Sequence, residues 1–491
     1  MSDCIVRIRP DLPVGTISPR IYGHFAEHIG RCCYDGLRPK EADIPQQNGF
    51  RTDVSEALHS LPTPLLRWPG GCYADHYHWK DGIGPPRDRP RRLGMSCGET
   101  VEEDNSLGTD EFLWFCAHIG AEPYLAGNVG SGTPQELCDW MEYCNTSLDT
   151  LWTRTRYQNG VEKPWHVRLW GVGNENWGCG GNYDAADYAR EYRRYATMLR
   201  HVDQKAELVV CGWDQEQWNI DLANTLRNHS DLIDHFSIHR YWGGGEEDGF
   251  GEEGYYQLLK QAEETEAYIQ RTHQVITDIL GKERKIGIAL DEWGAWHKQA
   301  SLGYDPAQRR GSYEQVNTLR DAIAAAIAFE GFHRQCNLLS MANIAQIVNV
   351  LQSPLQTHRS AMWRTPTYHV FHLYGRHQGA EAVTAEVENS GSLPTGYAAL
   401  SSTASQTSNK SLTVSLINRS YSEPVTLKLI GCESASFANA YILTASKPDA
   451  ANSEHEPDLV HPVKLNMEGS PSAGLRFTLP PHSIASVWLN H

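Results

Sequence analysis

The chain has 491 residues, 40% of them hydrophobic and 21% charged, a composition typical of a globular protein and not of a disordered one. This length exceeds one small domain and suits a large barrel with an accessory domain. The formal net charge of −17 disfavours nucleic acids and anionic membranes as partners and favours a neutral solute.

We expect neither a secretion signal nor a cysteine motif from this sequence. No run of about 18 apolar residues predicts a membrane-spanning helix, and the start, MSDCIVRIRP, lacks the charged-then-apolar pattern of a secretion signal. The twelve cysteines include one adjacent pair and no CxxC motif, which argues against zinc and redox sites. We therefore expect free thiols, most of them buried, in a reducing cytosol.

From about residue 20 to 375, short apolar runs alternate with longer helical patterns. Helical patterns are clearest over residues 185–203 and 316–334. The eight apolar runs are 21–25, 64–69, 122–128, 167–174, 207–213, 233–239, 285–292 and 337–343. Eight strand–helix alternations predict an α/β fold of the (β/α)₈ TIM-barrel type, with a doubly wound sheet as the alternative.

The composition of the sequence changes after about residue 375. Ser, Thr, Asn and Pro become more frequent there, and the helical periodicity ends. Alternating or β-branched runs at 411–419, 424–431, 438–445 and 483–490 predict an all-β, jelly-roll-like sandwich. The N-terminal run CIVRIRP also has the pattern of a strand. The expected division is an N-terminal strand (1–15) joining the sandwich, a catalytic barrel (16–375) and a C-terminal sandwich (376–491).

Polar side chains follow nearly every expected barrel strand, where a barrel enzyme carries its chemistry. Two acids are central: Glu175, in GVGNENWG after the fourth strand, and Glu292, in ALDEW after the seventh. Two carboxylates facing each other across a barrel mouth meet the requirement of glycoside hydrolysis. In such a pair, mutual repulsion raises one pKa and leaves the other group charged. A spacing of about 5 to 5.5 Å would imply retention of configuration.

Other interpretations of these residues remain open. A single glutamate at a strand end is most often a buried acid paired with an arginine or a solvated loop acid. Asn174 has an alternative role as a turn residue, and Tyr241 has one as a core tyrosine. His24, His28 and His239 could gather as a metal site, but dispersed histidines are mostly structural. GVGNEN lacks the third glycine of a dinucleotide motif, and GxSxG, P-loop and HExxH motifs are absent. The Gly-rich acidic segment 243–254 is either a solvated loop or a lid.

Eight motifs in order resemble family 51 of the glycoside hydrolases, the α-L-arabinofuranosidases. The resemblance covers nearly the whole chain. The motifs are GHFAEHIGRCCYDG, LLRWPGGCYADHYHWKDGIGP, NSLGTDEFLWFC, EPYLAGNVGSGT, GVGNENWGCGGN, FSIHRYW, ALDEWGAWH and MANIAQIVNVLQ. WGCGGN and DEWGAWH depart from commoner family patterns on the side where the leaving group binds.

The resemblance implies a role for each matched residue. Glu175 resembles the acid/base and Glu292 the nucleophile of a retaining mechanism. The residues implied in substrate binding or in positioning the nucleophile are Glu27, Arg67, Cys72, Asn174, His239, Tyr241, Trp296 and Gln346. Cys72 stands where many members have asparagine. The family further implies homo-oligomers, hexamers among them, and neither a metal nor an organic cofactor.

We therefore expect a cytoplasmic, exo-acting, retaining α-L-arabinofuranosidase that acts on arabinose-containing oligosaccharides. Two alternatives are a different retaining glycosidase on the same scaffold, such as a β-glucanase or galactofuranosidase, and a non-catalytic sugar-binding protein. Kinetics on matched aryl glycosides separate the first alternative. Loss of activity in variants of the two acids separates the second.

Overall fold

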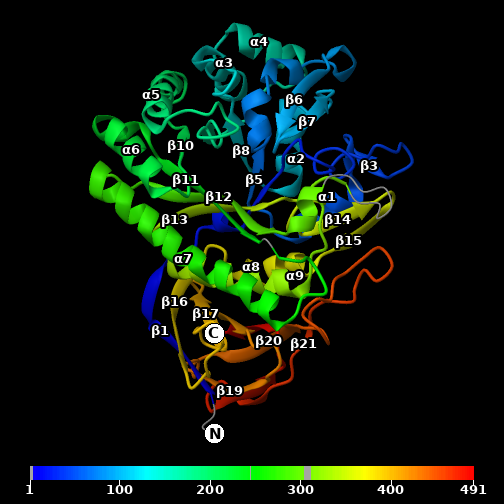
Figure 1. Cartoon of the computed structure of the whole chain (residues 1–491), viewed down its shortest axis with the longest axis vertical. Helices are drawn as coiled ribbons and strands as arrows, with labels where there is room; N and C mark the ends of the chain where they lie inside the picture. The colour runs from blue at the N-terminus through cyan, green and yellow to red at the C-terminus, as the bar shows by residue number, and fades with distance from the viewer. Residues whose placement is uncertain (1–3, 244, 303–310) are drawn as a thin grey trace.

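A computed structural model describes residues 4–243, 245–302 and 311–491 of the chain. Eight parallel strands form a closed barrel in the order β10-β11-β12-β13-β2-β5-β8-β9 (Figure 1). Their bounds are β2 (Gly23–Phe25), β5 (Leu65–Trp68), β8 (Glu122–Gly127), β9 (Leu169–Val172), β10 (Glu207–Cys211), β11 (His235–Gly243), β12 (Gly287–Trp296) and β13 (Leu339–Ala345). Each predicted apolar run overlaps one of these strands. Because the sheet closes, the barrel prediction is confirmed and the doubly wound alternative is excluded.

Helices alternate with the barrel strands along the chain. They are α1 (Thr52–Ser60), α2 (Thr109–Ile119), α3 (Pro134–Asn145), α4 (Leu151–Gln158), α5 (Ala185–Val202), α6 (Glu216–Leu226), α7 (Glu252–Leu280), α8 (Leu319–Arg334) and α9 (Pro366–Tyr374). The local sequence explains where two of these helices begin or end. Thr133 caps α3 by accepting a hydrogen bond from the backbone N–H of Glu136 at 3.1 Å, and Gly120 ends α2 in the left-handed conformation with φ of 79°.

Short strands and 3₁₀ helices lie in the segments that connect the larger elements. The strands are β3 (Gln46–Gln47), β4 (Phe50–Arg51), β6 (Arg92–Ser96), β7 (Glu99–Glu103), β14 (Leu355–His358) and β15 (Ala361–Arg364). The 3₁₀ helices are η1 (Pro19–Tyr22), η2 (Cys72–His76), η3 (Trp79–Gly82), η4 (Pro86–Asp88), η5 (Arg227–Leu232), η6 (Lys298–Leu302) and η7 (Gly375–His377).

The C-terminal part is an all-β unit below the barrel in Figure 1. Its strands are β1 (Cys4–Thr16), β16 (Glu381–Glu388), β17 (Leu400–Gln406), β18 (Leu412–Asn418), β19 (Val425–Ile430), β20 (Ser436–Leu443), β21 (Val463–Lys464), β22 (Glu468–Ser470), β23 (Gly474–Leu479) and β24 (Ser483–Asn490). They form one ten-stranded sheet in which β1 lies between β16 and β19. Side chains from both ends of the sheet share one buried core, so the sheet wraps around it.

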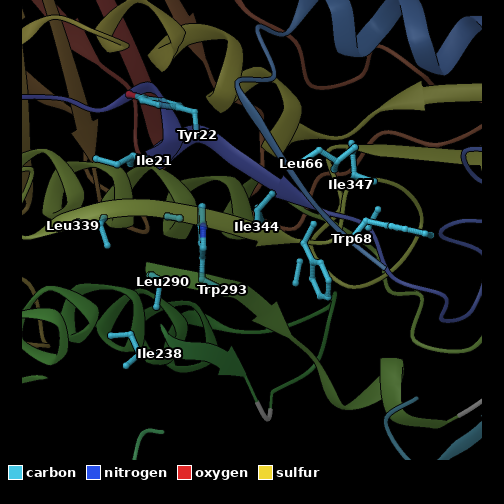
Figure 2. Close-up of a cluster of buried hydrophobic side chains, with 14 of the residues drawn as sticks. Ile21, Tyr22, Leu66, Trp68, Ile238, Leu290, Trp293, Leu339, Ile344 and Ile347 are labelled. Atoms are coloured by element: carbon cyan, nitrogen blue, oxygen red, sulfur yellow. The ribbon is translucent and has the colours of Figure 1, made fainter. Parts of the chain in front are cut away.

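Two apolar layers hold the barrel in shape. Inside it, a cluster of buried side chains comes from six different strands: Leu65, Tyr124, Leu169, Val209, Ala289 and Met341. A larger core lies between the strands and the surrounding helices, and Figure 2 shows part of it, with labelled side chains from η1, β5, β11, β12 and β13. Helix α8 is buried from Leu319 to His333 because it packs between the barrel and the all-β unit. The filled interior confines any ligand to the barrel mouth.

Candidate active site

The two acids singled out in the sequence meet at the carboxyl-terminal end of the barrel. Glu175 directly follows β9, and Glu292 lies on β12 opposite His239 of β11. One carboxylate oxygen of Glu175, one of Glu292 and a ring nitrogen of His239 all lie within 4.8 Å of one another. Such proximity matches the spacing of about 5 to 5.5 Å in retaining glycosidases and is too short for the inverting arrangement.

A tight loop brings Glu175 into the barrel mouth. Its backbone has φ of 42°, a left-handed conformation that is uncommon for residues other than glycine. The carbonyl oxygen of Glu175 accepts hydrogen bonds from the N–H of Gly178 at 2.7 Å and of Gly180 at 3.2 Å. These bonds hold the turn closed, so the loop supports the strained residue that presents the carboxylate.

Glu292 is fixed through both of its carboxylate oxygens. Arg67 donates from Nη1 to Oε1 at 2.8 Å, and the hydroxyl of Tyr241 donates to Oε2 at 2.7 Å. Arg67 also donates from Nη2 to the Oδ1 of Asn174 at 2.6 Å. Burial lowers the pKa of Arg67, but the neighbouring carboxylates of Asp291 and Glu292 raise it above its ordinary value. A permanently cationic, buried arginine therefore joins the two halves of the site.

His239 lies among three carboxylates. Its Nδ1 is 2.8 Å from Oε1 of Glu175 and 3.4 Å from Oε2 of Glu292, and its Nε2 is 3.4 Å from Oδ1 of Asp291. Burial lowers the pKa of His239, but the neighbouring carboxylates, Glu292 foremost, raise it to about 10. The imidazole is therefore cationic at neutral pH, and both ring nitrogens are donors.

Asp291 supports this arrangement from within the barrel. Burial alone would raise its pKa, but Arg67 and His239 hold the pKa well below the usual range. Its carboxylate accepts hydrogen bonds from the hydroxyls of Ser237 at 2.5 Å and Tyr124 at 2.8 Å. Asp291 is thus a buried anion that balances the two cations beside the acid pair.

Glu27 lies near Glu292 in the same site. Oε1 accepts hydrogen bonds from the hydroxyl of Ser96 at 2.7 Å and the backbone N–H of Tyr73 at 3.1 Å. Oε2 accepts from Nε2 of Gln346 at 3.0 Å. Burial, followed by the charge of Glu292, raises the pKa of Glu27 to about 7. The carboxyl is therefore poised between its two protonation states near neutral pH.

Aromatic rings form one wall of the site. Trp296 contacts Tyr241 edge-to-face, with ring centroids 5.1 Å apart, and Tyr313 with centroids 5.9 Å apart. The hydroxyl of Tyr313 donates to the carbonyl of Cys97 at 2.6 Å, at the tip of the β6–β7 hairpin. The indole is therefore held between rings from two other segments.

Cys72 differs from its predicted state. Its sulfur is bonded to that of Cys179, which lies 107 residues away, so the prediction of twelve free thiols is wrong for this pair. The barrel order places β5 close to β9, separated only by β8, so the loops after β5 and β9 can meet. The other ten cysteines are free. The disulfide leaves Cys72 without a thiol for a sugar contact, and it lies beside the acid, with Cys179 Sγ 3.7 Å from Oε2 of Glu175.

The three histidines considered as metal ligands have separate environments. His24 is buried and packs against Phe371 with ring centroids 4.7 Å apart, and burial lowers its pKa to about 3. His28 pairs with Glu103 at 2.6 Å. In the part of the chain that the structure describes, no candidate metal-binding group contains two of these histidines.

Contacts also anchor the acidic segment 243–254, of which Gly244 lies outside the described residues. Arg320 donates to the carbonyl of Glu246 at 3.0 Å and packs over the ring of Phe250 at 3.6 Å. Glu247 accepts a hydrogen bond from the N–H of Val316 at 2.9 Å. The segment is therefore tied to the start of α8 rather than freely solvated.

The sequence did not single out Asp75 and Ser96, which also hold the site together. Asp75 accepts hydrogen bonds from the backbone N–H groups of Val129, Gly130 and Asn174 at 2.7, 2.7 and 3.0 Å. Burial raises the pKa of Asp75 to about 7, and these bonds oppose the shift. The position of Asp75, three residues after Cys72, was the available signal, whereas nothing in the sequence marks Ser96.

Comparisons of the sequence with known proteins match α-L-arabinofuranosidases. The model for the α-L-arabinofuranosidase 1 domain matches residues 57–243, and that for the α-L-arabinofuranosidase C-terminal domain matches residues 291–483. An intracellular exo-α-L-arabinofuranosidase of Bacteroides ovatus is 38% identical over 99% of this chain and 95% of its own length. α-L-Arabinofuranosidase C of Emericella nidulans is 34% identical over 78% of this chain and 76% of its own.

Solved structures extend the comparison to the fold. The crystal structure of the GH51 arabinofuranosidase from Xanthomonas axonopodis pv. citri has a TM-score of 0.91 and 32% identity, covering 99% of this chain and 100% of that one. The arabinose complex of the α-L-arabinofuranosidase from Thermotoga maritima has a TM-score of 0.88 and 29% identity, with both chains fully covered.

Proposed function

The chain belongs to the α-L-arabinofuranosidases of glycoside hydrolase family 51, and we propose that it hydrolyses terminal, non-reducing α-L-arabinofuranosyl residues with retention of configuration. One observation carries the proposal: oxygens of two carboxylates, Glu175 and Glu292, lie within 4.8 Å of each other at the mouth of a closed barrel. This spacing leaves no room for a water between the second carboxylate and the sugar, as inversion requires, and fits a double displacement.

In the first step, Glu292 is the nucleophile. A carboxylate oxygen forms a bond to C1 of the arabinofuranosyl unit while the bond from C1 to the leaving oxygen breaks. Glu175 gives its proton to that oxygen, so the leaving group departs as a neutral alcohol. The hydrogen bonds from Arg67 and Tyr241 keep the Glu292 carboxylate oriented for attack.

In the second step, water resolves the covalent intermediate. Glu175, now a carboxylate, takes a proton from water while the water oxygen bonds to C1 and the bond to Glu292 breaks. His239 contacts both acids and is cationic, so it is placed to balance the change of charge on Glu175 between the two steps. Histidine at this position acts on the reaction through the acids that it positions.

The remaining site residues are assigned to sugar binding. Glu27, Asn174 and Gln346 offer hydrogen-bonding groups for furanose hydroxyls. Trp296 offers an apolar ring at the side of the pocket. Cys72 retains its backbone groups for such a contact, since its sulfur is bonded to Cys179.

Further properties are proposed on weaker support. We assign the catalytic unit to residues 16–375, with residues 1–15 and 376–491 in the all-β unit. The name of the Bacteroides ovatus relative supports an intracellular, cytoplasmic enzyme that acts on oligosaccharides. Among the described residues, no helix is long and apolar enough to cross a membrane. The enzyme is expected to form homo-oligomers and to use neither metal nor organic cofactor.

Turnover of p-nitrophenyl α-L-arabinofuranoside tests this proposal. The purified protein should release nitrophenol from this substrate and not from the matched β-glucoside or galactofuranoside. The Glu175→Ala and Glu292→Ala variants should each lose about 10²-fold or more of kcat/KM. Turnover of the β-glucoside alone would keep the mechanism and refute the substrate, and binding of arabinose without any turnover would favour a sugar-binding protein.

A further inference from the structure

The disulfide and the acid/base form one group of possible metal ligands. The Sγ atoms of Cys72 and Cys179 and a carboxylate oxygen of Glu175 all lie within 4.8 Å of one another. The two sulfurs are bonded to each other, so neither is a metal ligand in this state. Reduction of the bond gives two thiols beside the acid/base. No CxxC motif marks such a group, because its cysteines lie 107 residues apart in the sequence.

The spacing of these ligand atoms fits a tetrahedral zinc ion. Zinc binds thiolate sulfur at about 2.3 Å and carboxylate oxygen at about 2.0 to 2.2 Å, so two such ligands at a tetrahedral angle lie about 3.5 to 3.7 Å apart. The Sγ of Cys179 is 3.7 Å from Oε2 of Glu175, so this edge of the tetrahedron is already formed. The same geometry places the two sulfurs about 3.8 Å apart, a separation that opens once the bond between them is broken.

Other contacts hold the two cysteine-bearing segments together without the disulfide. Asp75 lies on η2 with Cys72 and accepts a hydrogen bond from the backbone N–H of Asn174 at 3.0 Å. The Nδ2 of Asn176 donates to the carbonyl of Gly180 at 2.7 Å and closes the loop that carries the second cysteine. Both segments therefore keep their positions when the disulfide is reduced, and the two thiols remain neighbours of the acid/base.

An ion can reach this group from solvent. The side chain of Glu175 is 21% exposed, and it lines a cavity of about 200 Å³. Cys179 is half-buried, whereas Cys72 is buried behind it. The cavity therefore gives the ion a path of entry, and a water molecule can take the fourth position beside three protein ligands.

We propose that reduction of the Cys72–Cys179 disulfide creates an inhibitory zinc site made of these two cysteines and Glu175. Two thiolates favour Zn²⁺ over Mg²⁺ and Ca²⁺, which prefer oxygen ligands. The ion would be an inhibitor and not a cofactor.

The chemistry has two steps. A dithiol reductant gives two electrons and two protons to the disulfide, so the dithiol becomes a disulfide and the enzyme gains two thiols. Zn²⁺ then displaces the two thiol protons and binds the Glu175 carboxylate. Held by the ion, Glu175 can neither give a proton to the leaving group nor take one from water. This inhibition rests on the proposed function, whereas the binding of zinc does not.

Isothermal titration calorimetry with Zn²⁺ tests the site itself. The wild type is titrated in its oxidised form and after reduction by a phosphine, which takes an oxygen from water, becomes the phosphine oxide and leaves two thiols. We expect the reduced protein to bind one more Zn²⁺ ion than the oxidised protein. Equal binding by the two forms would refute the site.

Three variants assign the ligands in the reduced protein. Cys179→Ser and Glu175→Gln each remove one ligand, and each should weaken the binding of this ion by about tenfold or more. Cys97→Ser is the matched control, because Cys97 is a half-buried free cysteine outside the proposed group, and it should bind zinc as tightly as the wild type. Binding that is lost in Cys97→Ser and kept in Cys179→Ser would refute the proposed ligands.

Turnover of p-nitrophenyl α-L-arabinofuranoside tests the inhibition. Saturating Zn²⁺ should lower kcat/KM of the reduced wild type by about 10²-fold or more, because the acid/base is withdrawn from proton transfer, and removal of the ion by a chelator should restore it. The oxidised wild type and reduced Cys179→Ser should keep most of their own activity. Equal inhibition of both redox forms would point to the Glu175, His239 and Glu292 group instead and refute the proposal.

Failure of the proposed function gives a different pattern. If the wild type has no activity before zinc is added, the proposed function is wrong, and calorimetry alone then decides the site. Zinc binding that requires reduction and is weakened in Cys179→Ser supports the site in that case. A lack of added binding after reduction refutes it, whatever the activity.

Discussion

Replacement of His239 by asparagine removes the cation between the two catalytic acids. The Nδ1 of His239 lies 2.8 Å from Glu175 and 3.4 Å from Glu292, and its Nε2 lies 3.4 Å from Asp291. An asparagine keeps a polar amide of similar reach but carries no charge. Asp291 and Glu292 would keep Arg67 as a paired buried cation, whereas Glu175 would lose its cationic partner.

The size of the effect follows from the pKa of this histidine. The pKa rises from 6.5 to about 10, which corresponds to about 5 kcal/mol of differential interaction between the two protonation states. The carboxylates that cause this shift surround His239 throughout the catalytic cycle. Only part of this free energy therefore acts on the transition state. Loss of one preorganised donor in an active site lowers kcat by about 10²-fold to 10³-fold, and we expect about 10²-fold for His239→Asn.

Stability gives an independent readout with a definite sign. Because folding raises the pKa of His239, the stability that it contributes is fully present below pH 6.5 and is lost as the pH rises through about 10. The wild type should therefore lose stability across this window in urea unfolding. The His239→Asn variant should lack this part of the pH dependence.

The assay is kcat/KM on p-nitrophenyl α-L-arabinofuranoside between pH 5 and pH 10. His118→Asn is the matched control, because His118 is exposed on α2 and stacks on Trp114 away from the site. The reasoning is refuted if His239→Asn keeps more than about a third of the activity at pH 7 and has the same stability profile as the wild type.

Three further variants test other parts of the site. Glu292→Ala should lose about 10²-fold or more of kcat/KM, and azide should restore activity and give the β-configured arabinosyl azide; an α-configured product would contradict the nucleophile assignment. Glu27 has a pKa raised from 4.5 to about 7, so the stability of the wild type should fall as the pH rises through this window. A Glu27→Gln variant whose thermal-melting temperature depends on pH as in the wild type would refute this assignment. The Cys72→Ser/Cys179→Ser double variant loses a cross-link across 107 residues, and its free energy of unfolding should fall by about 4 to 5 kcal/mol in the chain-entropy model. In urea unfolding, dithiothreitol should destabilise the wild type and leave the stability of the double variant unchanged.

Periodicity was sufficient to predict the barrel. Each of the eight apolar runs overlaps a strand, because parallel strands buried on both faces are continuous apolar segments. The helix expected at 185–203 is α5, and that expected at 316–334 begins at Leu319, after a Thr318–Asp321 capping box. The all-β strands were also predicted, but their joining into one sheet depends on long-range pairing that no local pattern encodes.

The candidate site was predictable where residues lie at strand ends. Glu175, Arg67, Tyr241 and Glu292 meet at one rim because the carboxyl ends of parallel barrel strands share a face. The structure adds that His239 contacts both acids, whereas the sequence placed it only at a strand end.

Residues on irregular segments could not be placed from the sequence. Ser96 ends a strand of the β6–β7 hairpin, and its contact with Glu27 joins residues 69 apart in the chain. Cys72 and Cys179 belong to loops whose approach depends on the order of the closed barrel. Spacing motifs describe neighbours in sequence, so these contacts have no local signature.

The configuration of the first released sugar tests the double displacement most directly. Proton NMR can follow hydrolysis of p-nitrophenyl α-L-arabinofuranoside before the anomers equilibrate. Because the oxygens of Glu175 and Glu292 lie within 4.8 Å of each other, the account predicts that α-L-arabinofuranose appears first and the β-anomer only later. Initial appearance of the β-anomer would show a single inverting displacement and contradict the roles of both acids.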